Sequence, residues 1–477
     1  MSTVLLMLLN PYQIMLYHHL LRCAVQRPAV FRIFIPDDRV VRLFHFLQIM
    51  RLPLLRHFAQ CLMIWIALSP HSVMGMTPLQ PLIDAAEVGA TLQLPPGRYS
   101  GPVLIDKPLT IDGAGQVTID GGGVGTVITI DTDGARLSNL HITGSGDRHN
   151  ELDAGILVSG KFNVIKDNRL DDVLFGIALH QSEHGIVRRN TIQSKVRELA
   201  QRGDGLRIWY SVGNKITQNR ILNARDVIIL DSRENYLAEN QVQGGRYSLH
   251  VVNSQGTQIK GNRFIDNEAG IFALKANGLV IQQNLVAEIR DVTGVGIGLK
   301  ESSSARIEEN RIFNVKIGIA LDLSPEDHDL PNYVSANLIA HNTVGIQFLS
   351  DRGGNHLSAN RFVNNYLPVA VRNGGGALKN RWGGNYWSDY AGFDQDQNGS
   401  GDTPYELYAY ADQLWLDFPG AQFFVASPTF SLLDFLERLA PFTEPRLMVR
   451  DHYPRFSGDD AELSVTQKTK PTTCTLC

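Results

Sequence analysis

One short pattern recurs along most of this chain and limits the folds that it can adopt. It consists of an apolar residue, two further residues, an asparagine, one residue and a second apolar residue, as in Ile165–Asn168–Leu170. Successive asparagines lie 22, 29, 21, 22, 22, 26, 27 and 23 residues apart. A period close to 22 leaves no room for a helix and a hairpin in each unit, but it suits three short strands joined by turns.

Most copies are followed by a glycine and then by alternating apolar residues, as in Gly318-Ile319-Ala320-Leu321. Such alternation indicates a β-strand. One unit cannot bury its apolar side chains alone, whereas stacked units share a continuous core. The repeat therefore predicts an all-β fold: a right-handed parallel β-helix solenoid with an N-terminal cap and a C-terminal extension that contains a helix. A leucine-rich repeat has a similar period, but this chain lacks its leucine frame.

The recurring asparagines are expected to turn inward at a bend and to hydrogen-bond along the stack. This structural ladder comprises Asn168, Asn190, Asn219, Asn240, Asn262, Asn284, Asn310, Asn337 and Asn360. We interpret these residues as part of the architecture and not as a ligand site.

The rest of the chain divides by composition. Residues 50–75 contain a short basic stretch, an apolar run and small residues, which is typical of a signal peptide. Residues 1–49 lack this order, and we interpret them as an over-extended start; the alternative is a longer membrane anchor. We expect residues 76–387 to form the β-helix, 388–455 the C-terminal extension and 456–477 a disordered tail. A net charge of −4 argues against a nucleic-acid partner.

Three insertions lengthen coils between the asparagine motif and the glycine motif, at residues 144–153, 193–204 and 288–294. Because they fall at the same point of the repeat, we expect one corner of the solenoid to carry all three. Insertions on one face often mark the working surface of a solenoid.

Oxygen-bearing side chains gather around Gly399, beyond the last coil. They are Asp394, Asp396, Asn398, Ser400 and Asp402. Acidic and amide residues at alternate positions before a glycine are typical of the first half of a calcium loop. The spacing predicts a structural Ca²⁺ site to which Ser400 contributes its carbonyl oxygen. Tyr405 stands where such a loop has its last glutamate, so a hydrogen-bonded turn is the alternative.

Residues 428–439 are predicted to form a helix, with Ser427 as its cap and Pro428 in its first turn. Its apolar stripe contains Phe430, Leu432, Leu433, Phe435, Leu436 and Leu439. About three turns are too few to cross a membrane, so we predict that the stripe binds a protein partner. The alternative is that the helix caps the last coil near Phe362.

Catalytic motifs are not evident in the sequence. Carboxylates do not recur as pairs on adjacent coils, and the chain has no nucleophile elbow, P-loop or zincin motif. We therefore expect a protein that is not an enzyme.

Several stretches resemble the NosD family: residues 108–113, 171–180, 384–390 and 402–405, and Ser427-Pro428 before the last apolar helix. The resemblance implies a periplasmic β-helix accessory protein that matures the copper centres of nitrous oxide reductase. It also implies an ABC transporter as partner, with a NosY-like membrane subunit and a NosF-like ATPase. Nitrous oxide reductase and a copper chaperone would be transient partners.

Two histidines are candidates for transient copper binding, because imidazole suits copper. His180 and His250 both follow the glycine-motif strand, two to three coils apart, which is too far for joint binding of one ion. Relatives often have a methionine where Val252 stands, which weakens the copper prediction. The alternative function is a carbohydrate-binding or carbohydrate-active β-helix protein. Aromatic residues spaced along one outer face would favour it, and Trp209 and Tyr210 are an adjacent pair.

Overall fold

The computed structural model describes residues 76–409, 427–428, 432, 435–436 and 446–456, except for residues 290, 292–293 and 373–375. The chain divides into two units, Met1–Gly75 and Met76–Cys477. The first unit lies outside the described residues, together with the signal peptide and the over-extended start that we predict in it. The predicted disordered tail beyond Phe456 also lies outside them.

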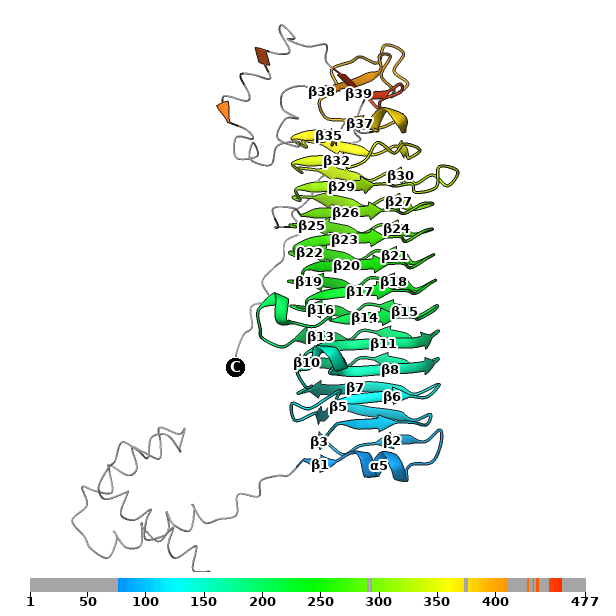
Figure 1. The fold of residues 1–477 in the computed structure, drawn as a ribbon, viewed down its shortest axis with the longest axis vertical. Helices are drawn as coiled ribbons and strands as arrows, with labels where there is room; N and C mark the ends of the chain where they lie inside the picture. The colour runs from blue at the N-terminus through cyan, green and yellow to red at the C-terminus, as the bar shows by residue number, and fades with distance from the viewer. Residues whose placement is uncertain are drawn as a thin grey trace, which may run out of the picture. The chain divides into compact units, whose positions relative to one another are not determined.

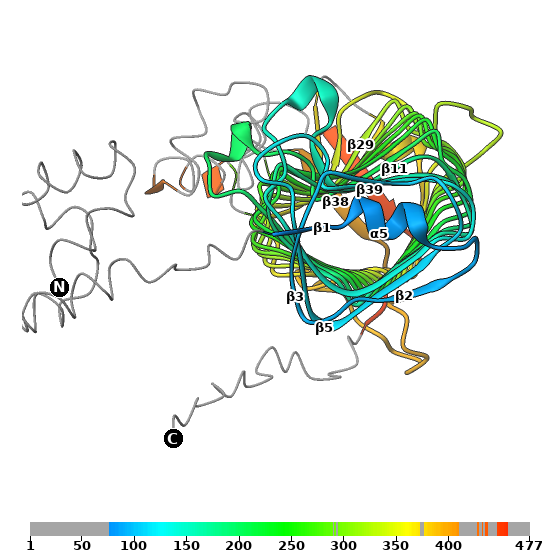
Figure 2. The ribbon, with the colours of Figure 1, turned by 90° about the horizontal axis from the view of Figure 1, so that it is seen from below.

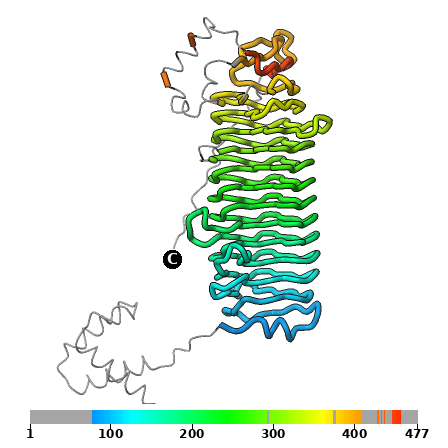
Figure 3. Tube along the Cα trace, viewed as in Figure 1, coloured from blue at the N-terminus to red at the C-terminus, as the bar shows by residue number. Residues whose placement is uncertain are grey.

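The described part of the second unit is a parallel β-helix, so the prediction from the repeat is confirmed (Figure 1). Most coils contribute three strands, and the coils stack one on another (Figure 3). Strands of successive coils pair in parallel and in register, so that Ile216 lies beside Leu237 and Leu237 beside Ile259.

One strand of each coil belongs to a 12-stranded sheet. In chain order its strands are β4 (Val103–Ile105), β6 (Ile128–Asp131), β8 (Ala154–Lys161), β11 (Phe175–Glu183), β14 (Leu206–Trp209), β17 (Asp226–Leu230), β20 (Tyr247–Val252), β23 (Ala269–Leu274), β26 (Val295–Lys300), β29 (Ile317–Asp322), β32 (Val344–Phe348) and β35 (Leu367–Val371).

The other strands of the coils form two rows of a 25-stranded sheet. One row contains β9 (Val164–Lys166), β12 (Ile186–Arg188), β15 (Lys215–Thr217), β18 (Tyr236–Ala238), β21 (Gln258–Lys260), β24 (Val280–Gln282), β27 (Arg306–Glu308), β30 (Tyr333–Ser335), β33 (His356–Ser358) and β36 (Arg381–Gly383). The other contains β10 (Arg169–Val173), β13 (Thr191–Ser194), β16 (Arg220–Leu222), β19 (Gln241–Gln243), β22 (Arg263–Ile265), β25 (Leu285–Ala287), β28 (Arg311–Phe313), β31 (Leu338–Ala340), β34 (Arg361–Val363) and β37 (Tyr386–Trp387). The longer β5 (Thr110–Asp120) and β7 (Arg136–Thr143) pair with each other along both halves of their length.

The bend before each ladder asparagine has a common backbone conformation. The preceding residue is left-handed in every case, for example Glu239 before Asn240 at φ 56° and Ala336 before Asn337 at φ 56°. Residues with a side chain adopt this region at a cost. The hydrogen bonds of the following asparagine hold the bend in place and offset that cost.

The glycine that opens the next strand is explained by the close approach of neighbouring coils. A side chain at Gly176 would place its Cβ 2.1 Å from the carbonyl oxygen of Gly205, and one at Gly270 would lie 2.0 Å from that of Gly296. Both distances are shorter than any van der Waals contact. The glycine motif is therefore a packing requirement of the solenoid.

Both ends of the core are covered. At the N-terminal end, α5 (Gln80–Ala85) buries Ile83 completely and forms the predicted cap. At the C-terminal end, Trp387 stacks on Phe362 and Tyr405 stacks on Trp387, each with ring centroids 4.3 Å apart. Tyr405 begins β38 (Tyr405–Ala409), which pairs with β39 (Arg446–Asp451) in an antiparallel direction. These strands cap the last coil near Phe362.

Candidate functional site

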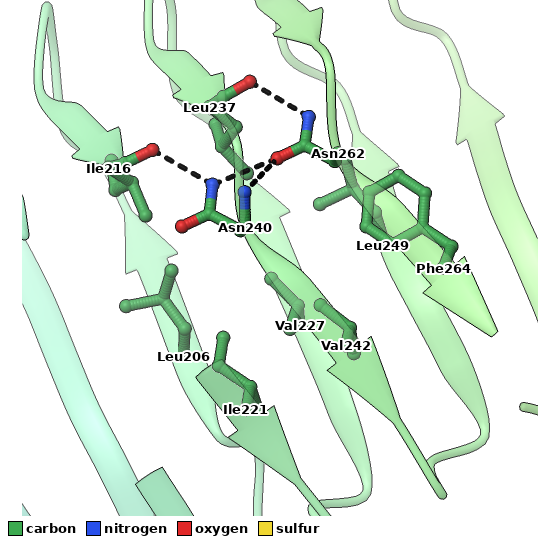
Figure 4. Close-up of a pocket in the computed structure, with 10 residues that line it drawn as sticks. All are labelled: Leu206, Ile216, Ile221, Val227, Leu237, Asn240, Val242, Leu249, Asn262 and Phe264. Carbon is green, nitrogen blue, oxygen red and sulfur yellow. Dashed lines mark hydrogen bonds between the residues drawn. The ribbon is translucent and has the colours of Figure 1, made fainter. Parts of the chain in front are cut away.

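The ladder asparagines form a continuous hydrogen-bonded column in the core. The backbone N–H and the side-chain Nδ2 of Asn240 both donate to Oδ1 of Asn262 at 2.9 Å. The second Nδ2 hydrogen of Asn240 reaches the carbonyl oxygen of Ile216, also at 2.9 Å (Figure 4). The same pattern continues through Asn360 to Asn385. Every polar group of these buried side chains is therefore used within the protein, which leaves none for a ligand.

The structure contains further hydrogen-bonded columns of polar side chains that the repeat pattern did not predict. One contains Asn214 and Asn235, and Asn332, Asn355 and Asn380 form another. A third consists of serines whose hydroxyl groups accept backbone N–H groups of the preceding coil, as Ser211 does from Ser182. The apolar-x-x-Asn-x-apolar pattern does not surround Asn214, Asn235, Asn332 or Asn355, and only their spacing of one coil could have indicated them.

Two of the three insertions lie against each other at one corner. The first forms the 3₁₀-helix η3 (His149–Glu151) and the second forms η4 (Leu199–Gln201), on one side of the solenoid (Figure 2). The His149 ring and the carbonyl oxygen of Gln201 are 3.1 Å apart. Lys195 of the second insertion bridges to Asp147 of the first, with Nζ and Oδ1 2.8 Å apart.

A chain of alternating charges continues from this corner across β14, β17 and β20. Asp204 forms two salt bridges: its Oδ2 lies 3.0 Å from Nη1 of Arg207, and its Oδ1 lies 2.8 Å from Nη2 of Arg225. Arg246 forms a bidentate pair with Asp226, to which Tyr247 also donates its backbone N–H. The hydrogen bond from Arg246 to this carboxylate raises the pKa of Arg246. We call these five charged residues the arginine–aspartate chain.

Sequence reasoning missed this chain, although it carries a signal. Asp204, Arg225 and Arg246 lie 21 residues apart, which places them at one position of successive coils. The carboxylates of Asp204 and Asp226 are almost fully buried, with 1% and 2% of their side chains exposed, whereas Arg246 is 46% exposed. The chain therefore presents guanidinium groups to its surroundings.

The two candidate copper ligands do not come together. His180 on β11 stacks on Trp209 with ring centroids 4.8 Å apart, and Trp209 lies beside Leu230. His250 on β20 lies three coils further along and in a different row, beside Ile228. Burial lowers the pKa of His250, and Arg246 acts in the same direction while Asp226 opposes it. Within the described ranges, no three His, Cys, Asp or Glu side chains form a group that could hold a metal ion.

Aromatic rings do line the outer face of the 12-stranded sheet, but their faces are already occupied. The Trp209 ring stacks with His180, and the guanidinium Cζ of Arg207 lies 5.6 Å from the centroid of the Trp209 ring. Tyr247 stacks with His250, with ring centroids 4.8 Å apart, and the guanidinium Cζ of Arg246 lies 5.0 Å from the centroid of the Tyr247 ring. A sugar ring stacks on an open aromatic face, so this arrangement does not favour the carbohydrate-binding alternative.

The predicted calcium loop is organised by its own hydrogen bonds. Asp394 accepts the backbone N–H groups of Asn398 and Gly399, at 3.1 and 2.9 Å. Asp402 accepts that of Gln395 at 2.6 Å, and Asp396 accepts Nδ2 of Asn398 at 2.7 Å. These contacts form the hydrogen-bonded turn that we named as the alternative, and calcium binding stays a prediction.

The predicted docking helix lies largely outside the described residues, including Phe430, Leu433 and Leu439. Four of its residues are described as helical: Pro428, Leu432, Phe435 and Leu436. Leu432 and Phe435 are each 56% exposed and Leu436 is 41% exposed. None of these three apolar side chains is buried in the cap of the last coil.

Known proteins similar to this chain include NosD proteins. A family model described as "Periplasmic copper-binding protein (NosD)" matches residues 193–392. A relative from Pseudomonas aeruginosa, named "Probable ABC transporter binding protein NosD", is 27% identical over 397 residues, which cover 77% of this chain and 88% of the relative. A relative of the same name from Stutzerimonas stutzeri is 24% identical over 414 residues, or 80% and 89% of the two chains. The chain is therefore similar to the NosD family, over residues 193–392 by the family model and over most of its length by the two relatives.

Solved structures similar to this chain include the A-modules of the mannuronan C-5 epimerases AlgE6 and AlgE4 from Azotobacter vinelandii. Both have a TM-score of 0.53, at 17% and 16% identity. The matches cover 62% of this chain and 92% and 95% of the two modules. At such identity the likeness shows the β-helix fold alone. In the described part of the chain, no helix is both long and apolar enough to cross a membrane.

Proposed function

We propose that this chain is a NosD-like periplasmic accessory protein that works with an ABC transporter in copper delivery to, or maturation of, nitrous oxide reductase. One observation carries the proposal: the family description names periplasmic copper binding, and both relatives are named ABC transporter binding proteins. The protein would act without catalysis of its own. Copper would be cargo. His180 or His250 would bind it transiently, each through its own imidazole.

The apolar stripe at Phe430–Leu439 would provide the contact with the membrane subunit of the transporter. The exposure of Leu432, Phe435 and Leu436 supports this role, because three large apolar side chains left in water are a liability unless a partner covers them. The alternative, that this helix caps the last coil, is less favoured because Trp387 and Tyr405 already cover Phe362.

Deletion of the gene in its own host is expected to abolish growth on nitrous oxide and to leave nitrous oxide reductase without its full copper content. Growth on oxygen is the control. The wild-type gene should restore both properties, whereas a Leu432→Asp, Leu436→Asp double variant should be exported and folded but should not co-purify with the membrane subunit. Undiminished growth of the deletion strain would contradict the function, and full rescue by the double variant would contradict the docking role alone.

We also propose that Asp394, Asp396, Asn398, Ser400 and Asp402 bind Ca²⁺ as a structural ion. Excess calcium is then expected to raise the melting temperature of the wild-type protein relative to EDTA, because a ligand that binds only the folded state stabilises it. The Asp396→Ala variant should show no such difference. Coincident wild-type melting curves with calcium and with EDTA would mean that the loop is only a turn.

A further inference from the structure

The 12-stranded sheet carries an apolar stripe on its outer surface, over strands that no described helix covers (Figure 1). This outer stripe consists of Trp209, Ile228, Leu230, Val252, Phe272 and Leu274, all partly exposed. Its residues lie in two adjacent rows in register, because Leu230 pairs with Trp209 and Val252, and His250 with Ile228 and Phe272.

The outward residues of the 25-stranded sheet provide a comparison within the same coils. Lys215, Arg220, Gln258 and Arg263 are exposed there, and the surface is mostly polar. Stability of the stack needs apolar residues inside each coil and makes no demand on the outside. A sheet with an open apolar face buries it against another layer, so the outer stripe indicates a missing partner.

The charged residues at the border of the outer stripe indicate which charge the partner carries. The arginine–aspartate chain lies along one side and contains three guanidinium groups against two carboxylates, a net charge of +1. Both carboxylates lie beneath the arginines, whereas Arg246 is half-exposed. The border thus offers positive charge at Arg246, with which an acidic side chain can pair.

We propose that the outer stripe docks a protein partner through an amphipathic helix that carries an aspartate or glutamate opposite Arg246. A helix fits because the four strands β14, β17, β20 and β23 span about 14 Å at the usual strand spacing, close to three helical turns. A glycan fits less well, since the faces of Trp209 and Tyr247 are covered by His180, Arg207, His250 and Arg246. Ring edges and aliphatic side chains are left, and these suit the apolar side chains of a protein.

Photo-crosslinking in the native cells tests this surface. The full chain would carry p-benzoylphenylalanine at Leu230, and in a matched control at Leu222, which is equally half-buried on the outside of the 25-stranded sheet. We expect a product from position 230 alone, and mass spectrometry should map it to an apolar segment with an acidic residue within one helical turn. An Arg246→Gln change should reduce the yield about fivefold, and Arg246→Lys should retain most of it.

Four results would overturn the proposal: equal products at positions 230 and 222, a product with a second copy of this chain, a product with a glycan, or a mapped segment without an acidic residue. If Arg246→Gln does not fold, raising the salt concentration tests the same charge, because an exposed ion pair weakens with ionic strength. A yield from position 230 that is insensitive to salt would then count against the pairing. Copper delivery is tested separately by the gene deletion.

Discussion

Replacing Asn262 with leucine is expected to lower the free energy of unfolding by about 3–5 kcal/mol, a large part of the stability of an ordinary domain. In the structure, Oδ1 of Asn262 accepts both N–H groups of Asn240, and its Nδ2 donates to the carbonyl oxygen of Leu237 at 3.0 Å. Leucine has a similar volume but leaves these buried groups without partners. Each such group costs about 1–3 kcal/mol.

Urea unfolding followed by circular dichroism measures the effect. Gln258→Leu, on the exposed outside of the same coil, is the control and should change stability little. Asn262→Asp should also be strongly destabilising, because it keeps the acceptor for Asn240 but places a buried carboxylate oxygen against the carbonyl oxygen of Leu237 and Oδ1 of Asn284. Equal midpoints for the wild type and Asn262→Leu would show that the ladder contributes little.

The fold could be predicted because the ladder uses one residue type at one position of each coil. An asparagine at a coil bend offers a donor and an acceptor in the direction of the stack, and no other common residue replaces it without loss. Its spacing therefore appears directly in the sequence. The inward isoleucines and valines on either side of it then give the strands.

The left-handed bends could not be predicted, because the residues at these positions share a backbone conformation but not a side-chain type. The residue before the ladder asparagine is aspartate at Asp167, arginine at Arg189, glutamine at Gln218 and alanine at Ala336. Neither glycine nor any other single residue type marks the position. The conformation is imposed by the strands on both sides and by the asparagine that follows.

The candidate surface was only partly predictable. The corner formed by insertions 144–153 and 193–204 follows from their position in the repeat, and the structure joins them through His149 and Gln201. The outer stripe could not be predicted from the sequence. The alternation of apolar residues that indicates a strand does not show whether its outward residues face solvent or a partner. Only the register places Ile228 beside His250 and His250 beside Phe272.

The end of the ladder depends on a residue far away in the sequence. Each asparagine donates toward the C-terminal end of the stack, so the last one, Asn385, needs an acceptor that has no donor of its own to satisfy. Asp451 of β39 provides it and is fully buried. Its Oδ2 accepts the backbone N–H and Nδ2 of Asn385 at 3.1 and 2.9 Å, and Nε1 of Trp387 at 3.3 Å. Its Oδ1 accepts the backbone N–H groups of Gly384 and Tyr453, each at 3.2 Å.

Asp451→Ala is therefore expected to destabilise the C-terminal coils by about 3–5 kcal/mol, because it leaves five donors without an acceptor. Asp451→Asn should lose less, since its oxygen can still accept from Asn385 while its NH₂ faces the N–H groups of Gly384 and Tyr453. Asp351→Ala, which removes an exposed carboxylate, is the control. Solenoid coils contact only their neighbours, so hydrogen exchange should accelerate first at β37 and β34 and leave β9 and β12 protected. Unchanged exchange at β37 in Asp451→Ala would mean that the aromatic stack of Phe362, Trp387 and Tyr405 closes the core without help from the carboxylate.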